Sequence, residues 1–153
     1  MKTIKPVEKT ITVNRDAEAA FRFYTKNFDA WWPKETHSLG ADREGVPPAR
    51  VAMDEKAGGQ LYEVSADGTR RSWGTIRIWE PGKRLVHSWQ FDKPDAQATE
   101  VEILFTDLGD GRTRIDLTHS GWENDPDGET LREGYHMGWD PVLAGLEAGC
   151  NAR

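Results

Sequence analysis

Cysteine is nearly absent from this sequence of 153 residues, and its single copy, Cys150, lies close to the C-terminus. One cysteine cannot form an internal disulfide, so we expect a protein of a reducing, cytoplasmic compartment. Long apolar runs are missing as well, since no segment approaches the ~20 apolar residues of a membrane helix. The first residues, Met1 to Pro6, lack the apolar core of a signal peptide. We therefore expect no membrane partner.

Basic clusters are also lacking. The chain has 20 Lys and Arg against 26 Asp and Glu, a formal net charge of −6, and no run of basic residues interrupts this excess. A field of negative sign repels phosphate groups. Nucleic acid is therefore not an expected partner.

Motifs for catalysis or metal binding do not occur. The four histidines fit no ligand spacing such as H-E-x-x-H, and no serine stands in a G-x-S-x-G context. Gly58-Gly59 and the stretch 109–111 do not open a helix, as phosphate-binding loops do. Asp125, Asp127 and Glu129 form an incomplete calcium-loop pattern, which we interpret as a solvated acidic loop. We expect no metal and no cofactor, and we assign no catalytic residue.

Aromatic residues are abundant: seven Trp, five Phe and three Tyr in a chain whose apolar share is only 37%. Disordered chains are poor in such residues, so the composition predicts a folded protein. A chain of this length forms one domain with a sizeable core, which we place over residues 1–153. Because aliphatic side chains are few and aromatic rings are many, we expect rings to line part of the core, which would leave some of it unfilled.

The order of elements follows from periodicity. Alternation predicts a strand over 7–13, and apolar residues at helical spacing predict a helix from 17 to 24 after the capping residues Asn14 and Asp16. Residues 31–33 indicate a short second helix and its exit, and 40–48 a loop. Six further strands are predicted at 50–54, 60–65, 70–79, 84–91, 99–106 and 113–119, joined by short turns that favour antiparallel pairing.

A long helical pattern ends the chain, with Leu131, Tyr135, Trp139 and Leu146 on its buried face. Pro141 is expected to kink this helix or to begin a new segment. The resulting order, β-α-α-β6-α, predicts an α+β fold. A curved antiparallel sheet of about seven strands would wrap around the long C-terminal helix, with an internal cavity between them.

Four stretches in this order form a familiar pattern: Ile11-Thr-Val with Phe21 to Thr25 and Trp31-Trp32; Gly59 to Glu63; Trp73-Gly74 through Trp79-Glu80-Pro81 to Trp89; and Thr113 to Trp122 followed by Gly138-Trp139, Leu143 and Leu146. The pattern resembles the AHSA-like branch of the SRPBCC superfamily (START-like, Bet v-type helix-grip fold), named after the activator of the heat-shock-protein-90 ATPase. The resemblance implies the helix-grip fold, with a cavity between the sheet and the last helix. It covers nearly the whole chain, but members of this fold have diverse functions.

The resemblance suggests which side chains surround such a cavity. Indole rings suit the walls of a site for a flat or apolar ligand, and histidines or a glutamate can orient it. The alternative is that several tryptophans are plain core and that the histidines are hydrogen-bonded structural groups. The candidate cavity residues are Phe21, Trp31, Trp32, His37, Glu63, Trp73, His87, Trp89, His119, Tyr135, His136 and Trp139.

Three functions remain open. The favoured hypothesis is a domain that binds a small apolar or aromatic ligand without catalysis. The second is an enzyme of the cyclase or hydrolase kind that uses cavity His and Glu as acid and base. The third is a protein-interaction module that contacts a chaperone. Eukaryotic activators of this kind carry an additional N-terminal domain, and the single domain expected here counts against that role.

Overall fold

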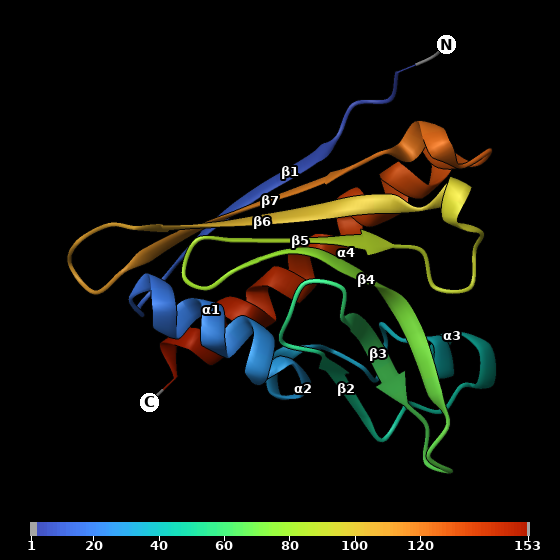
Figure 1. Ribbon diagram of the computed structural model, residues 1–153, viewed down its shortest axis with the longest axis horizontal. Coiled ribbons are helices and arrows are strands. Elements are labelled where there is room, and N and C mark those ends of the chain that lie inside the picture. The colour runs from blue at the N-terminus through green and yellow to red at the C-terminus, as the bar shows by residue number, and fades with distance from the viewer. Residues whose placement is uncertain (1–2, 153) are drawn as a thin grey trace.

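Alternation of buried and exposed side chains defines the strands of the computed structural model, which describes residues 3–152. In β6 (Thr99–Asp107), for example, Thr99, Val101, Ile103 and Phe105 are all buried. Together the strands form a seven-stranded antiparallel sheet in the order β1-β7-β6-β5-β4-β3-β2 (Figure 1). The other strands are β1 (Val7–Val13), β2 (Arg50–Met53), β3 (Gln60–Val64), β4 (Arg70–Glu80), β5 (Arg84–Trp89) and β7 (Thr113–Ser120).

The sheet curves where β4 links its two halves. The register shifts between Leu61 and Tyr62 in the β3–β4 pair and between Ile76 and Ile78 in the β4–β5 pair. Such bulges bend a strand and increase its twist. At Gly74 the backbone of β5 approaches so closely that a Cβ atom would stand 2.0 Å from the carbonyl oxygen of Ser88. Glycine is therefore required at this bend.

The N-terminal helices are short. The Asp16 side chain accepts a hydrogen bond from the Ala19 amide at 2.8 Å and begins α1 (Ala17–Lys26). The second helix, α2 (Phe28–Trp31), ends where Trp32 adopts extended geometry before Pro33. Both helices were predicted from the sequence.

One prediction in this region is wrong. The segment 40–48 was expected to be a loop, but it includes most of α3 (Leu39–Glu44). Ser38 caps this helix by accepting from the Ala41 amide, and Gly45 ends it with a φ of 67°. The helix borders the candidate site, so the error has consequences there.

The C-terminal helix α4 (Gly128–Asn151) continues through Pro141, so no new segment begins at that proline. In Figure 1 it passes behind the strands, and α1 and α2 pack beside its C-terminal half. Hydrogen bonds to the start of the chain fix the C-terminal end of this helix. The Arg15 Nε donates to the Cys150 carbonyl at 2.8 Å, and the Asn151 side chain accepts from the Asn14 amide. Cys150 is a buried free thiol whose pKa burial raises to about 11.

These elements confirm the predicted α+β class and its curved antiparallel sheet with a long C-terminal helix. Two short 3-10 helices, η1 (Asp95–Gln97) and η2 (Trp122–Asn124), complete the described chain. Within residues 3–152, none of the helices has both the length and the apolar character needed to cross a bilayer.

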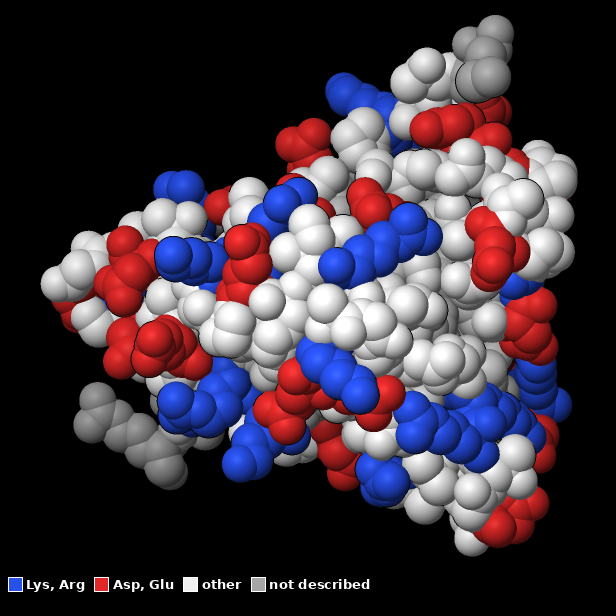
Figure 2. Space-filling view, in the orientation of Figure 1, with Lys and Arg blue, Asp and Glu red and all other residues white. Residues whose placement is uncertain are grey.

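Charged side chains of both signs are intermixed on the face shown in Figure 2. Several form ion pairs at the surface, such as Arg84 with Glu102 at 2.7 Å. This face therefore presents no broad field of one sign.

Candidate functional site

A cavity of about 470 Å³ lies between the N-terminal half of α4 and the loops at one end of the sheet. Three stretches far apart in sequence supply its walls, within residues 32–43, 89–99 and 122–142. The volume falls in the range of about 300–1,000 Å³ that is typical of small-molecule sites. Its aromatic wall consists of Trp32, Trp89, Phe91, Trp122, Tyr135 and Trp139.

The cavity-facing side of α4 has one position without a side chain. Leu131, Tyr135, Gly138 and Val142 line the cavity at helical spacing, and a Cβ atom at Gly138 would meet nothing within 4 Å. Packing does not require glycine there, and glycine inside a helix is about 0.8–1.0 kcal/mol less favourable than alanine. Its effect at this position is to leave room in the cavity. Gly134 is equally unobstructed but is exposed and does not line the cavity.

The indole N–H groups of the four lining tryptophans all donate within the protein. Trp32 Nε1 donates to the His37 carbonyl at 2.7 Å, and Trp122 Nε1 donates to the His119 carbonyl at 2.9 Å. Trp89 Nε1 donates to the Tyr135 hydroxyl at 3.0 Å, and Trp139 Nε1 donates to His119 Nδ1 at 3.1 Å. With these donors engaged, the tryptophans offer a ligand mainly apolar ring surface.

His119 lies directly behind this wall. Its Nδ1 accepts from Trp139, and its Nε2 lies 2.7 Å from Thr99 Oγ1, which itself donates to the Trp89 carbonyl at 3.1 Å. Because the threonine proton is already used, the pattern assigns the imidazole proton to Nε2. Burial, with a smaller effect of His87, lowers the pKa of His119 to about 3. The ring is therefore neutral and fully hydrogen-bonded, and it holds the wall in place.

His87 is a second buried histidine, on β5. Its Nδ1 lies 3.0 Å from the Ser88 carbonyl, so this nitrogen carries the proton. Nε2 is buried with no hydrogen-bond partner among the described residues. Burial lowers the pKa of His87 to about 4, which keeps the ring neutral in the folded protein. His87 does not line the cavity.

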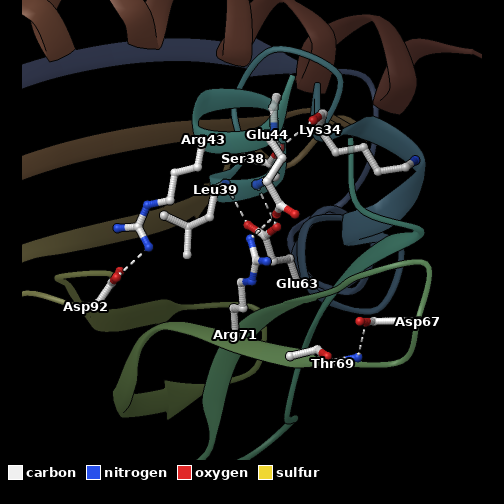
Figure 3. A network of polar contacts seen from close by, with 12 residues as sticks. Lys34, Ser38, Leu39, Arg43, Glu44, Glu63, Asp67, Thr69, Arg71 and Asp92 are labelled. Carbon is white, nitrogen blue, oxygen red and sulfur yellow. Dashed lines mark hydrogen bonds and ion pairs between the residues drawn. The ribbon is translucent and has the colours of Figure 1, made fainter. Parts of the chain in front are cut away.

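Glu63 holds the helix that borders the cavity (Figure 3). Its fully buried carboxylate, on β3, accepts from the Leu39 amide at 2.6 Å and from the Gly40 amide at 3.0 Å. It also accepts from Trp73 Nε1 at 2.8 Å. These bonds satisfy the first amides of α3, which a six-residue helix cannot satisfy internally. Glu63 is thus engaged within the fold and does not line the cavity.

Two ion pairs connect the segments around the cavity mouth. Arg43 on α3 pairs with Asp92 at 2.5 Å, as Figure 3 shows, and Lys93 pairs with Asp125 at 2.5 Å. Hydrogen bonds to Arg43 and Lys93 lower the pKa of Asp92 and of Asp125, respectively. Asp42 also lines the mouth but forms no ion pair with any residue in 3–152. Asp125 belongs to the loop interpreted as solvated, yet its side chain is only 3% exposed.

The wall at Phe91 is conformationally strained. Phe91 has a φ of 55°, the one positive φ outside glycine in the described chain. Such a conformation costs on the order of 1–3 kcal/mol and occurs often at ligand sites. Here the Gln90 and Phe91 amides both donate to the Trp73 carbonyl, each at 2.9 Å. The two bonds hold the Phe91 ring at the cavity.

The structure places the candidate cavity residues in four settings. Trp32, His37, Trp89, Tyr135 and Trp139 line the cavity. The others do not: Phe21, Trp31 and Trp73 belong to the apolar core, Glu63, His87 and His119 are buried polar groups, and His136 is exposed. Within residues 3–152, no group of three or more His, Cys, Asp or Glu side chains is placed to hold a metal ion.

Several lining residues were not among the candidates, notably Asp42, Phe91, Thr99 and Trp122. Trp122 could have been identified, because it lies only three residues after the end of the last predicted strand, 113–119. Asp42 had none, since α3 was not expected there.

Comparison with known proteins agrees with this architecture. A family model described as Activator of Hsp90 ATPase homolog 1-like protein matches residues 14–150. No curated protein matches the sequence. The solved structure of the anthrahydroquino-γ-pyrone synthase Txn09, determined as a complex, is 30% identical, covers 95% of this chain and 97% of its own, and has a TM-score of 0.67.

Two more distant structures support the fold alone. CalC, a self-sacrificing resistance protein from Micromonospora echinospora, is 24% identical over 95% of this chain and 93% of its own, with a TM-score of 0.67. The Aha1 dimer from Colwellia psychrerythraea is 13% identical over 97% of both chains, with a TM-score of 0.68. The family predicted from the sequence motifs is confirmed: this chain belongs to the Activator of Hsp90 ATPase homolog 1-like family.

Proposed function

We propose that this protein binds a flat, neutral aromatic small molecule in the cavity beside α4. The observation that carries the proposal is the aromatic wall, whose four indole N–H groups are all engaged internally. A wall of this kind favours an apolar ring system, because the ligand gains ring contacts and leaves no indole N–H unpaired.

The charge at the mouth supports a neutral ligand. Arg43 and Lys93 form ion pairs with Asp92 and Asp125, whereas Asp42 forms no ion pair with any described residue and interacts with Arg43 only through the field of its charge. An anionic ligand would meet the Asp42 charge without an unpaired cation to offset it, although solvent screens this exposed group. The 30% identity to Txn09 also fits, since that synthase is named for a polycyclic aromatic product.

Titration of the intrinsic tryptophan fluorescence tests the proposal. A panel of neutral two-ring and three-ring aromatic compounds should include members that quench the emission saturably. Gly138→Leu would place a side chain in the cavity and should weaken binding by at least tenfold, which corresponds to about 1.4 kcal/mol. Gly134→Leu is the matched control on the same helix and should bind like the wild type. A flat response to the whole panel, or equal binding by both variants, would contradict the proposal and favour a protein-contact role.

A second candidate, catalysis on the bound molecule, rests on His37. This residue lines the cavity, and its Nδ1 lies 2.7 Å from Thr36 Oγ1, while no described residue partners its Nε2. Partial burial lowers the pKa of His37, so the neutral ring is available as a proton acceptor at neutral pH. Mass spectrometry of a bound compound would show turnover by the wild type. His37→Gln should then stop turnover while leaving affinity in place, whereas unchanged turnover in that variant would exclude His37.

A further inference from the structure

The hydroxyl of Tyr135 is held within the aromatic wall at a fixed place. Its ring lies 5.4 Å from the Trp122 ring and 5.1 Å from the His119 ring, measured between centroids. The hydroxyl oxygen accepts the Trp89 indole N–H at 3.0 Å. Both Tyr135 and Trp89 line the cavity. One residue of the wall therefore fixes the position of the hydroxyl of another.

The hydrogen of this hydroxyl has no acceptor among the described residues. The neighbouring imidazole is already used: His119 Nδ1 accepts from Trp139, and His119 Nε2 donates to Thr99. The Thr99 hydroxyl in turn donates to the Trp89 carbonyl. The charge of Asp42 acts on Tyr135, but no hydrogen bond joins the two side chains. A donor that remains unpaired in a dry site is costly, so a ligand that fills the cavity must either supply an acceptor or lose affinity.

Tyr135 is protonated at neutral pH, because burial is the largest influence on its pKa and raises it above the usual value of a tyrosine. It can therefore act as a donor but not as an anion. Another polar lining residue, Gln90, does not compete for the same role: its side-chain amide donates to the Lys93 carbonyl at 3.2 Å and to Asp95 at 2.8 Å.

We infer that the cavity is selective for neutral polycyclic aromatic carbonyl compounds, such as quinones, whose carbonyl oxygen accepts the hydrogen bond of Tyr135. This inference rests on the proposed function and specifies its ligand class. The ring system packs on the tryptophan wall and over Gly138, where the helix lacks a side chain. The carbonyl then supplies the acceptor that the protein itself does not provide.

Two matched probes test this selectivity by isothermal titration calorimetry. Hydroxymethylanthraquinone and hydroxymethylanthracene share three fused rings and a neutral polar group, but only the first has ring carbonyls. The wild type should bind the quinone about three- to tenfold more tightly, the ratio expected from one net hydrogen bond. Tyr135→Phe should reduce quinone affinity by the same factor and leave the affinity for the hydrocarbon unchanged.

An infrared difference spectrum of the bound quinone provides a readout that a purely structural role of Tyr135 would not give. The carbonyl band should shift to lower frequency in the wild-type complex and return toward its free position in Tyr135→Phe. Equal affinity of the wild type for both probes, or an unshifted carbonyl band in its quinone complex, would overturn this inference alone. If neither probe nor any other aromatic compound binds, the proposed function itself fails.

Discussion

Because His87 and His119 are buried, we expect the free energy of unfolding to fall steeply on mild acidification. Folding lowers the pKa of His87 to about 4 and that of His119 to about 3, in both cases mainly through burial. The unfolded chain regains ordinary histidines with pKa values near 6.5. Below about pH 6.5 the unfolded state therefore binds two protons that the folded state excludes, so stability falls as the pH falls.

The size of the effect follows from this difference. Each proton of difference changes the free energy of unfolding by about 1.36 kcal/mol per pH unit, so two histidines give a slope of about 2.7 kcal/mol per unit. Between pH 6.5 and pH 4.5 the loss reaches about 4.5 kcal/mol, because the unfolded histidines are only half protonated at pH 6.5, and this is comparable to the whole stability of many domains. The lowered pKa values of Asp92 and Asp125 begin to cost stability only from about pH 5 downward, as the pH falls through the ordinary carboxyl range, so most of this window belongs to the histidines.

Urea unfolding followed by circular dichroism, repeated between pH 7.5 and pH 4.5, measures this slope. His87→Leu should reduce the slope by about half, to roughly 1.4 kcal/mol per pH unit, whatever its effect at neutral pH. His136→Gln alters an exposed histidine and is the control, with an expected slope like that of the wild type. Two results would refute the reasoning. One is a wild-type slope well below about 1.4 kcal/mol per pH unit, the value for one proton. The other is an equal slope for His87→Leu and the wild type.

Three shorter predictions follow from other sites. Glu63→Gln leaves at least one buried amide without an acceptor and should lower the free energy of unfolding by about 1–3 kcal/mol. Hydrogen exchange at the start of α3 should become faster in this variant. The control, Glu44→Gln, removes only an exposed ion pair and should change the free energy of unfolding by less than about 1 kcal/mol. The Cys150 thiol should resist a disulfide reagent until the protein is unfolded, because it is buried and its pKa is raised to about 11; rapid labelling of the folded protein would contradict this. Gly134→Ala and Gly138→Ala should each raise the melting temperature by about 2–4 °C, since neither new methyl group meets another atom, and a lower melting temperature in either would show a hidden contact.

The strands could be predicted from sequence because their signal is local. In β7, for example, Thr113, Ile115, Leu117 and His119 are buried in strict alternation, and that pattern is visible without knowledge of the partner strand. The helix α3 could not be predicted in the same way. Its first amides depend on Glu63, which lies 24 residues from Leu39 in the chain. Ser38 and Gly45 are local signals for the two ends of this helix, but the contact with Glu63 is not visible in the sequence around residues 39–44.

In the candidate site, too, the residues with a local sequence pattern could be predicted and those that depend on distant contacts could not. Tyr135 and Trp139 were identified because helical spacing and the family's cavity both indicate this face of the last helix. His119 was expected to point inward, and it does, but its role as an acceptor for Trp139 depends on a tautomer fixed by Thr99 on a different strand. Phe91 carries no local mark of its positive φ, because two amide bonds to Trp73 impose it. Long-range hydrogen bonds thus account for most of what the sequence did not show.

Some of the side chains that hold the cavity walls do not themselves touch the cavity. Glu63 and His119 fix the walls from within the sheet, yet neither lines the cavity, whereas Asp42 and Phe91 line it from outside the strands. Substitutions at Asp42 or Phe91 can therefore alter the ligand preference without breaking the buried hydrogen bonds of Glu63 and His119. Two proteins of this fold can share their scaffold and still differ in what they bind. Comparing residues 32–43, 89–99 and 122–142 among relatives should therefore distinguish ligand groups better than overall identity does.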